Sequence, residues 1–231
     1  MNCPPPPLLT GTDLCTSQPP GYEWDDWDPY SQLGDPDQRT QALLRAVSGR
    51  AKLAFAIGCT EWIVGRLDAQ LGMDRSPWHF IGACWAFEMS DDYALPPESD
   101  ESQWQGIVRA PVDLALMTIL NTSIGIEDDN AEVDAAFAAQ IALHVQCDRG
   151  PFLTWRRLAL HRLRRLYPAA EGEPMGEPVP REAVQFPSRF DPRTATADIK
   201  NFLAAVHVGS NPFLIACDDP VADDGESNDA G

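Results

Sequence analysis

Apolar residues recur at helical spacing along most of the chain between residues 37 and 208. The segments "QRTQALLRAV" and "AKLAFAIGCTEWIVGRLDAQL" carry them three and four positions apart, and Ser48-Gly49 predicts a break or bend between the two. The segment 76–90 opens with Ser76 at the predicted N-cap and Pro77 at the first helical position, two signals of a helix start. Its apolar residues cover nearly the whole circumference, which predicts a central, buried helix.

The remaining periodic segments predict four further helices. One begins near Pro111, taken as a first-turn position, and another spans 131–147 with an apolar stripe from Val133 to Val145 that includes Phe137 and Ile141. An amphipathic segment at 152–167 turns its arginines mostly outward, and the last helix spans about 195–208. Two-residue alternation is scarce. The pattern therefore predicts an all-α fold, an irregular helical bundle or α-α array.

The ends of the chain differ from the periodic middle. Residues 1–36 hold eight prolines and no basic residue, which predicts an extended, irregular arm. Residues 37–217 form the predicted single helical domain, within which a long Pro-rich loop near 168–192 lies over the surface. Residues 218–231 are too polar to fold alone and predict a disordered acidic tail.

Net charge narrows the classes of partner. The 35 acidic residues against 17 basic residues give a formal charge of −18, which repels phosphate backbones and anionic lipids. We therefore expect neither nucleic-acid nor membrane binding. The same field attracts a basic partner, although solubility alone explains the acidity equally well.

The chain carries no signal-peptide pattern, and charged residues interrupt its most apolar segments, so we expect a soluble, cytoplasmic protein. Its fifteen arginines against two lysines, with abundant alanine and proline, are typical of a GC-rich bacterial genome.

The six cysteines include no CxxC pair and predict buried free thiols. A bridge between Cys3 and Cys15 is conceivable, but a cytosolic location disfavours it. His144 and Cys147 share a helical face, yet two ligands do not make a metal site. We predict no metal and no cofactor.

Three segments combine acidic and aromatic side chains, a combination typical of hot spots that bind basic proteins. For the arm, the alternative is that its rings dock on the protein's own helices. The predicted partner-binding residues are Tyr22, Glu23, Trp24, Asp25, Asp26, Trp27, Asp28, Tyr30, Glu88, Asp91, Asp92, Tyr93, Glu127, Asp128 and Asp129.

Glu61 is unusual because it interrupts an apolar helix, with Gly58 and Gly65 on the same face. This predicts either a small pocket or, as the preferred alternative, an internal salt bridge to an arginine, with the arginines of 156–165 as candidates. The arginines of 149–165 form the chain's basic concentration. We interpret them as partners of the acidic loops rather than as a nucleic-acid site.

No common enzyme motif is present, so we predict no catalytic residue and no enzymatic activity. Our first hypothesis is a protein-binding module, a bacterial immunity or antitoxin-type inhibitor that neutralises a basic toxin; the chain resembles that class in composition alone. The alternatives are an adaptor or effector chaperone, and an enzyme with a nonstandard helical active site. Candidate acid-base residues for the enzyme are Glu61, Glu88, Asp91, Asp92 and His79. Nothing in the sequence indicates the oligomeric state.

Overall fold

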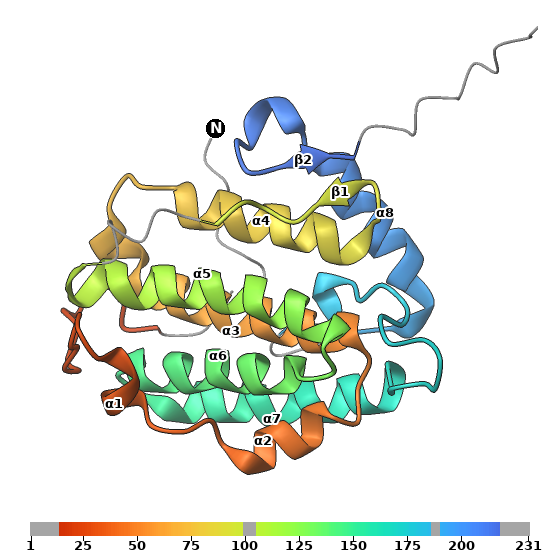
Figure 1. Cartoon of the computed structure of the whole chain (residues 1–231). Helices are drawn as coiled ribbons and strands as arrows, with labels where there is room; N and C mark the ends of the chain where they lie inside the picture. The colour runs from red at the N-terminus through yellow and green to blue at the C-terminus, as the bar shows by residue number, and fades with distance from the viewer. Residues whose placement is uncertain (1–13, 99–104, 186–189, 218–231) are drawn as a thin grey trace, which may run out of the picture.

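The computed structural model describes residues 14–98, 105–185 and 190–217, and within them helices predominate (Figure 1). This confirms the all-α prediction, whereas the predicted acidic tail lies outside the described residues. The α-helices are α1 (Pro29–Leu33), α2 (Gln38–Leu44), α3 (Gly49–Leu71), α4 (Ser76–Met89), α5 (Gly106–Glu127), α6 (Ala131–Val145), α7 (Arg149–Leu166) and α8 (Ala195–Ala205). Two short strands, β1 (Tyr93–Ala94) and β2 (Ile215–Ala216), pair in antiparallel fashion beside α8.

Helix α3 is the central helix of the fold, whereas the sequence pattern predicted α4 in that position. Nearly all of α3 is buried, because α4, α5, α6 and α7 pack around it. The predicted break at Ser48-Gly49 is confirmed: the Ser48 side chain caps α3 by accepting from the Ala51 N–H, 3.3 Å away. A Cβ at Gly49 would lie 2.7 Å from Ile126 of α5, so only glycine permits this close crossing.

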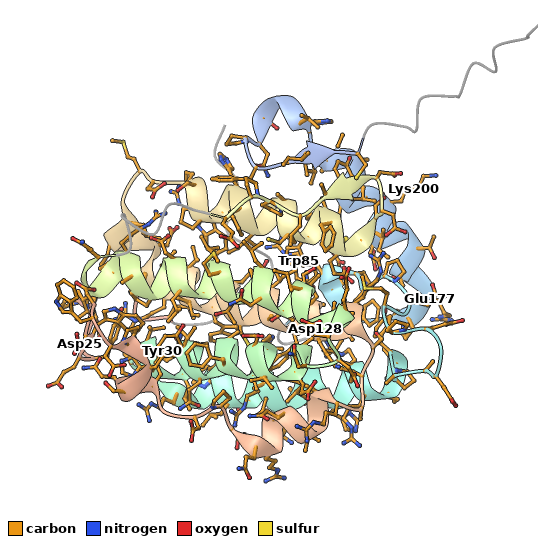
Figure 2. The ribbon with its side chains drawn as sticks, in the orientation of Figure 1. Asp25, Tyr30, Trp85, Asp128, Glu177 and Lys200 are labelled. Atoms are coloured by element: carbon orange, nitrogen blue, oxygen red, sulfur yellow. A yellow bond between two sulfur atoms is a disulfide. The ribbon has the colours of Figure 1, made fainter. Side chains whose placement is uncertain are left out.

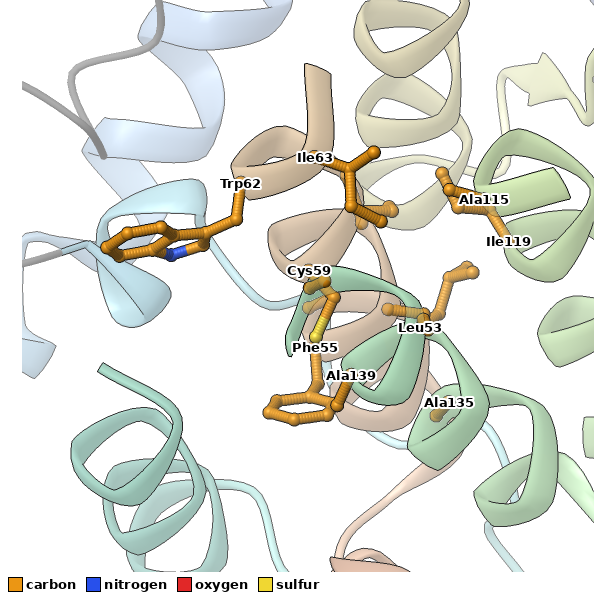
Figure 3. Close-up of a cluster of buried hydrophobic side chains, with 14 of the residues drawn as sticks. Leu53, Phe55, Cys59, Trp62, Ile63, Ala115, Ile119, Ala135 and Ala139 are labelled. Atoms are coloured by element: carbon orange, nitrogen blue, oxygen red, sulfur yellow. The ribbon is translucent and has the colours of Figure 1, made fainter. Parts of the chain in front are cut away.

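The core around α3 combines aromatic rings with small residues. Trp62 packs on Phe152 and Trp155 of α7, with ring centroids 5.6 and 6.0 Å apart. Ala135 and Ala139 of α6 lie close to Leu53 and Phe55 of α3 (Figure 3). Their small side chains permit close approach of the two helices.

Helix α5 begins at Gly106, so Pro111 lies inside the helix and not in its first turn as predicted. Proline has no N–H, which leaves the Ile107 carbonyl without its helical donor. The Tyr22 hydroxyl of the arm donates to that carbonyl instead. By length and composition α5 is apolar enough to cross a membrane, a property shared by core helices of soluble proteins, and 61% of its most apolar window is buried against the other helices.

The Pro-rich loop after α7 contributes to the core as well as lying over it. Its residues Val179, Ala183 and Val184 are fully buried. Trp155 of α7 donates its Nε1–H to the Val184 carbonyl at 2.6 Å, which fixes the loop against the aromatic cluster. This loop therefore closes one end of the helical array.

Candidate protein-binding groove

The first half of the N-terminal arm packs against the helices, and the second half is exposed to solvent. Tyr22 and Trp24 are half-buried against the core, and the Tyr22 ring meets His144 of α6 edge-on at 5.2 Å. Arg66, fully buried on α3, donates to the carbonyls of Gln18 and Pro19, both at 3.2 Å. The first half of the arm therefore docks on the protein's own helices, as the alternative prediction states.

A disulfide between Cys15 and Cys147 fixes the arm covalently beyond the end of α6. The prediction of free thiols is wrong for this pair, because residues 132 positions apart meet where the arm crosses the end of α6. It is correct for Cys59 and Cys84, which are free and buried; burial raises the pKa of both thiols. Cys217 is free but exposed.

Where the arm crosses the end of α6, it also contacts the ring of His144. Its Nε2 lies 2.8 Å from the Glu23 carbonyl, so both members of the predicted His144 and Cys147 pair have other partners. Within the described residues, no group of three or more His, Cys, Asp or Glu side chains is placed to hold a metal ion.

The second half of the arm presents its rings to solvent. Trp27 is 97% exposed and Tyr30 is 60% exposed. Neighbouring carboxylates hold the backbone there: Asp25 accepts from the Trp27 N–H at 2.9 Å, and Asp28 caps α1 by accepting from the Ser31 N–H at 3.1 Å. The exposed tryptophan therefore projects from an ordered turn.

A groove of about 410 Å³ runs between α1 and α6, and we call it the α1–α6 groove. Its floor holds the stacked rings of Tyr30 and Phe137, with centroids 5.3 Å apart and 17° between the ring planes. Val133 was expected in the core, but α1 is too short to cover it, and it is 40% exposed in this groove. The lining residues are Tyr30, Ser31, Gly34, Asp35, Pro36, Val133, Asp134 and Phe137.

The α1–α6 groove is acidic and holds no basic side chain. Asp35 and Asp134 supply its two charges. Asp134 is half-buried, and no described residue forms an ion pair or a side-chain hydrogen bond with its carboxylate. Burial raises the pKa of Asp134, since desolvation disfavours the charged form without a compensating cation. A cation supplied by another molecule would offset the desolvation cost of the charged Asp134 carboxylate.

Apart from Tyr30, the predicted partner-binding residues do not line the α1–α6 groove. In Figure 2, Asp25 of the arm lies at the left edge of the molecule, whereas Asp128 of the turn after α5 lies near its middle. Glu127, Asp128 and Asp129 are exposed at that turn. Asp92 is exposed, and Tyr93 is half-buried in β1. Asp91 pairs with Arg50 at 2.6 Å.

Glu88 is a correction to the predicted binding surface, because its side chain is fully buried. Its Oε1 accepts from the Val179 N–H at 2.8 Å, and burial raises its pKa well above the ordinary value. Glu88 lies in the core because α4 is surrounded by apolar residues. The sequence suggested an exposed position instead, because Glu88 is acidic and lies close to a charged loop. Glu88 anchors the Pro-rich loop and cannot contact a partner.

Glu61 forms the predicted internal salt bridge, but with a different arginine. Arg181 of the Pro-rich loop donates to Glu61 Oε1 at 2.6 Å, and the Trp85 indole N–H donates to the same oxygen at 2.9 Å. Burial raises the pKa of Glu61, and Arg181 and Trp85 oppose that shift. The face around Gly58 is no open pocket, because a Cβ there would lie 2.8 Å from the Trp155 ring. Gly65 is buried on the same helix.

Comparison with known proteins adds no relative: no protein-family model, no curated protein and no solved structure matches the chain.

Proposed function

We propose that the protein binds a basic protein partner through the α1–α6 groove and the adjacent Trp27. The observation that carries the proposal is Asp134, a half-buried carboxylate without a cation, which lies beside the exposed Tyr30 ring stacked on the buried Phe137. An arginine of the partner would donate to Asp134 while its planar guanidinium lies against the Tyr30 ring. Trp27 would then enter an apolar pocket of the partner, as tryptophan does at many hot spots.

The remaining acidic surface supports this proposal through kinetics. A formal charge of −18 attracts a basic protein over long range and raises its association rate at low ionic strength. A surface that masks the basic site of a toxin would act as an inhibitor of the immunity or antitoxin type. We favour the inhibitor role for this chain.

The first partner to test is a basic protein encoded next to the gene of this chain, with the association and dissociation rates measured by surface plasmon resonance. Trp27→Ala should raise the dissociation rate and cost about 2 kcal/mol of binding free energy, while the melting temperature stays unchanged because the ring is almost wholly exposed. Asp134→Asn should cost about 1.5 to 3 kcal/mol, the range for a hydrogen bond to a charged group.

Asp128→Asn is the matched control, since Asp128 is an exposed carboxylate that does not line the groove. It should slow association slightly at low salt and leave dissociation unchanged. If Trp27→Ala and Asp134→Asn bind like the unchanged protein, the α1–α6 groove is not the contact surface. The inhibitor role also requires that co-expression with the unchanged chain, and not with Trp27→Ala, protects cells from the partner.

A further inference from the structure

A second groove, between α2 and α7, has the opposite charge. Its volume is about 420 Å³, and we call it the α2–α7 groove. Four arginines and one aspartate line it, which gives a local charge of +3 when His161 is neutral. The lining residues are Asp37, Arg39, Thr40, Leu43, Leu153, Arg156, Arg157, Leu160, His161 and Arg164.

The arginines and leucines that α7 contributes to the groove lie on one face of the helix. The six α7 residues of the lining lie three and four positions apart, so they form one stripe along the helix that faces α2. Within the stripe, Leu160 is buried and Leu153 is 39% exposed, so an apolar floor runs between cationic side chains. Leu43 of α2 completes the floor.

Among the described residues, three of the four groove arginines, Arg39, Arg157 and Arg164, have no carboxylate partner. For Arg157 and Arg164 this is contrary to the prediction that the acidic loops pair with the arginines of 149–165. Arg156 has a carboxylate partner, Asp37, at 3.8 Å. Asp37 is already engaged, because its carboxylate caps α2 by accepting from the backbone of Arg39 and Thr40. Among the described residues, no hydrogen bond or ion pair engages the guanidinium of Arg39, Arg157 or Arg164. These guanidinium groups present their donors to solvent.

The excess negative charge of the whole protein does not cancel this local field. The screening length at physiological ionic strength is about 8 Å, so carboxylates elsewhere on the surface act weakly on the groove. The guanidinium groups that line one small cavity act together at short range. Local charge therefore governs what enters this groove.

We propose that the α2–α7 groove binds a soluble small molecule that carries a phosphate monoester and an apolar body. The guanidinium fork matches the geometry of phosphate oxygens and binds them in pairs, and a phosphate monoester carries nearly two negative charges at neutral pH. Leu153 and Leu160 receive the apolar body. The volume lies in the range of small-molecule sites.

Phenyl phosphate is the probe, titrated into the full chain with inorganic phosphate as the reference ligand, and methyl NMR signals of Leu153 and Leu160 report the place of binding. A ligand of this size should bind with a dissociation constant on the order of 1 mM. Arg157→Ala and Arg164→Ala should each weaken binding about ten-fold through the loss of a hydrogen bond to a charged group. Leu153→Asn should weaken phenyl phosphate and leave inorganic phosphate unchanged.

Arg165→Ala is the matched control, since Arg165 is an exposed arginine of α7 outside the groove lining. It should leave the affinity unchanged, and circular dichroism should show that every variant is folded. Equal weakening by Arg165→Ala would reveal nonspecific attraction and overturn the proposal, as would titration without shifts at Leu153 and Leu160. Tighter binding of a glutamate-rich peptide or of phosphatidate vesicles at the same methyl groups would assign the groove to another class of ligand and also overturn it.

Discussion

Replacing Glu61 with alanine should destabilise the fold strongly, because two donors converge on one buried oxygen. In Glu61→Ala, the Trp85 indole N–H loses its acceptor inside the core, and Arg181 loses its counter-ion. Trp85 is fully buried, whereas the Arg181 side chain retains 17% exposure. Water can therefore reach the arginine but not the indole.

The expected cost follows from these environments. A buried N–H without a partner costs about 1 to 3 kcal/mol. An orphaned partner of a buried ion pair costs about 3 to 5 kcal/mol when fully enclosed, and partial exposure of Arg181 places it below that range. With the two losses taken together, we expect about 4 kcal/mol, or a drop of roughly 12 °C in the melting temperature for a chain of this length.

Chemical denaturation of single and double variants tests the pairing itself. Glu61→Gln keeps an acceptor for Trp85 and should cost about half as much as Glu61→Ala. Arg181→Ala should also destabilise, and the double variant with Glu61→Ala should cost less than the sum, with a coupling of about 1 to 3 kcal/mol. Glu177→Ala, an exposed carboxylate of the same loop, is the control and should be neutral.

A loss below about 1 kcal/mol in Glu61→Ala would refute this reasoning, as would additive effects of the Glu61 and Arg181 variants. Either result would mean that Glu61 and Arg181 do not depend on each other. The Pro-rich loop would then be held by its apolar residues alone.

Two further predictions concern the same loop. Burial raises the pKa of Glu88, so the native state retains a proton that the unfolded chain has lost, and stability falls as pH rises from the ordinary glutamate range towards the folded pKa. The stability of Glu88→Gln relative to the unchanged protein, measured by denaturant titration, should therefore be greater at pH 8 than at pH 5; a constant difference would contradict the assignment. Gly172 and Gly176 both adopt positive φ, 81° and 70°, but only at Gly176 would a Cβ meet Ser48, at 2.4 Å. Thermal melting should thus show a loss of about 1 kcal/mol for Gly172→Ala and at least twice that for Gly176→Ala, and equal losses would exclude the clash.

Local pattern was sufficient for the helices after α1 and for the break before α3, because periodicity and capping act between residues close in sequence. It missed α1, which lies in the segment predicted to be an irregular arm. It misplaced the start of α5, since Pro111 is tolerated inside the helix where Tyr22 supplies the missing donor. Long-range pairs could not be predicted. Neither Arg181 opposite Glu61 nor Cys147 opposite Cys15 leaves a trace in the spacing of nearby residues.

The candidate groove was predictable only in part. Acidic and aromatic composition identified the arm as a surface of interest, but Trp24 and Trp27 have similar neighbours in sequence, and only packing makes one half-buried and the other exposed. Asp134 ends the acidic segment 127–134, but nothing in the sequence distinguished it from the other carboxylates of that segment. Its importance comes from α1, which leaves the first turns of α6 uncovered.

The attachments of the arm also determine the order in which the chain can be completed during synthesis. Residues 15–22 leave the ribosome early, yet their contacts lie on Arg66, Ile107 and His144, and their covalent bond is made with Cys147. The arm must therefore wait while α3, α5 and α6 emerge. The first described segment of the chain is therefore among the last to reach its place.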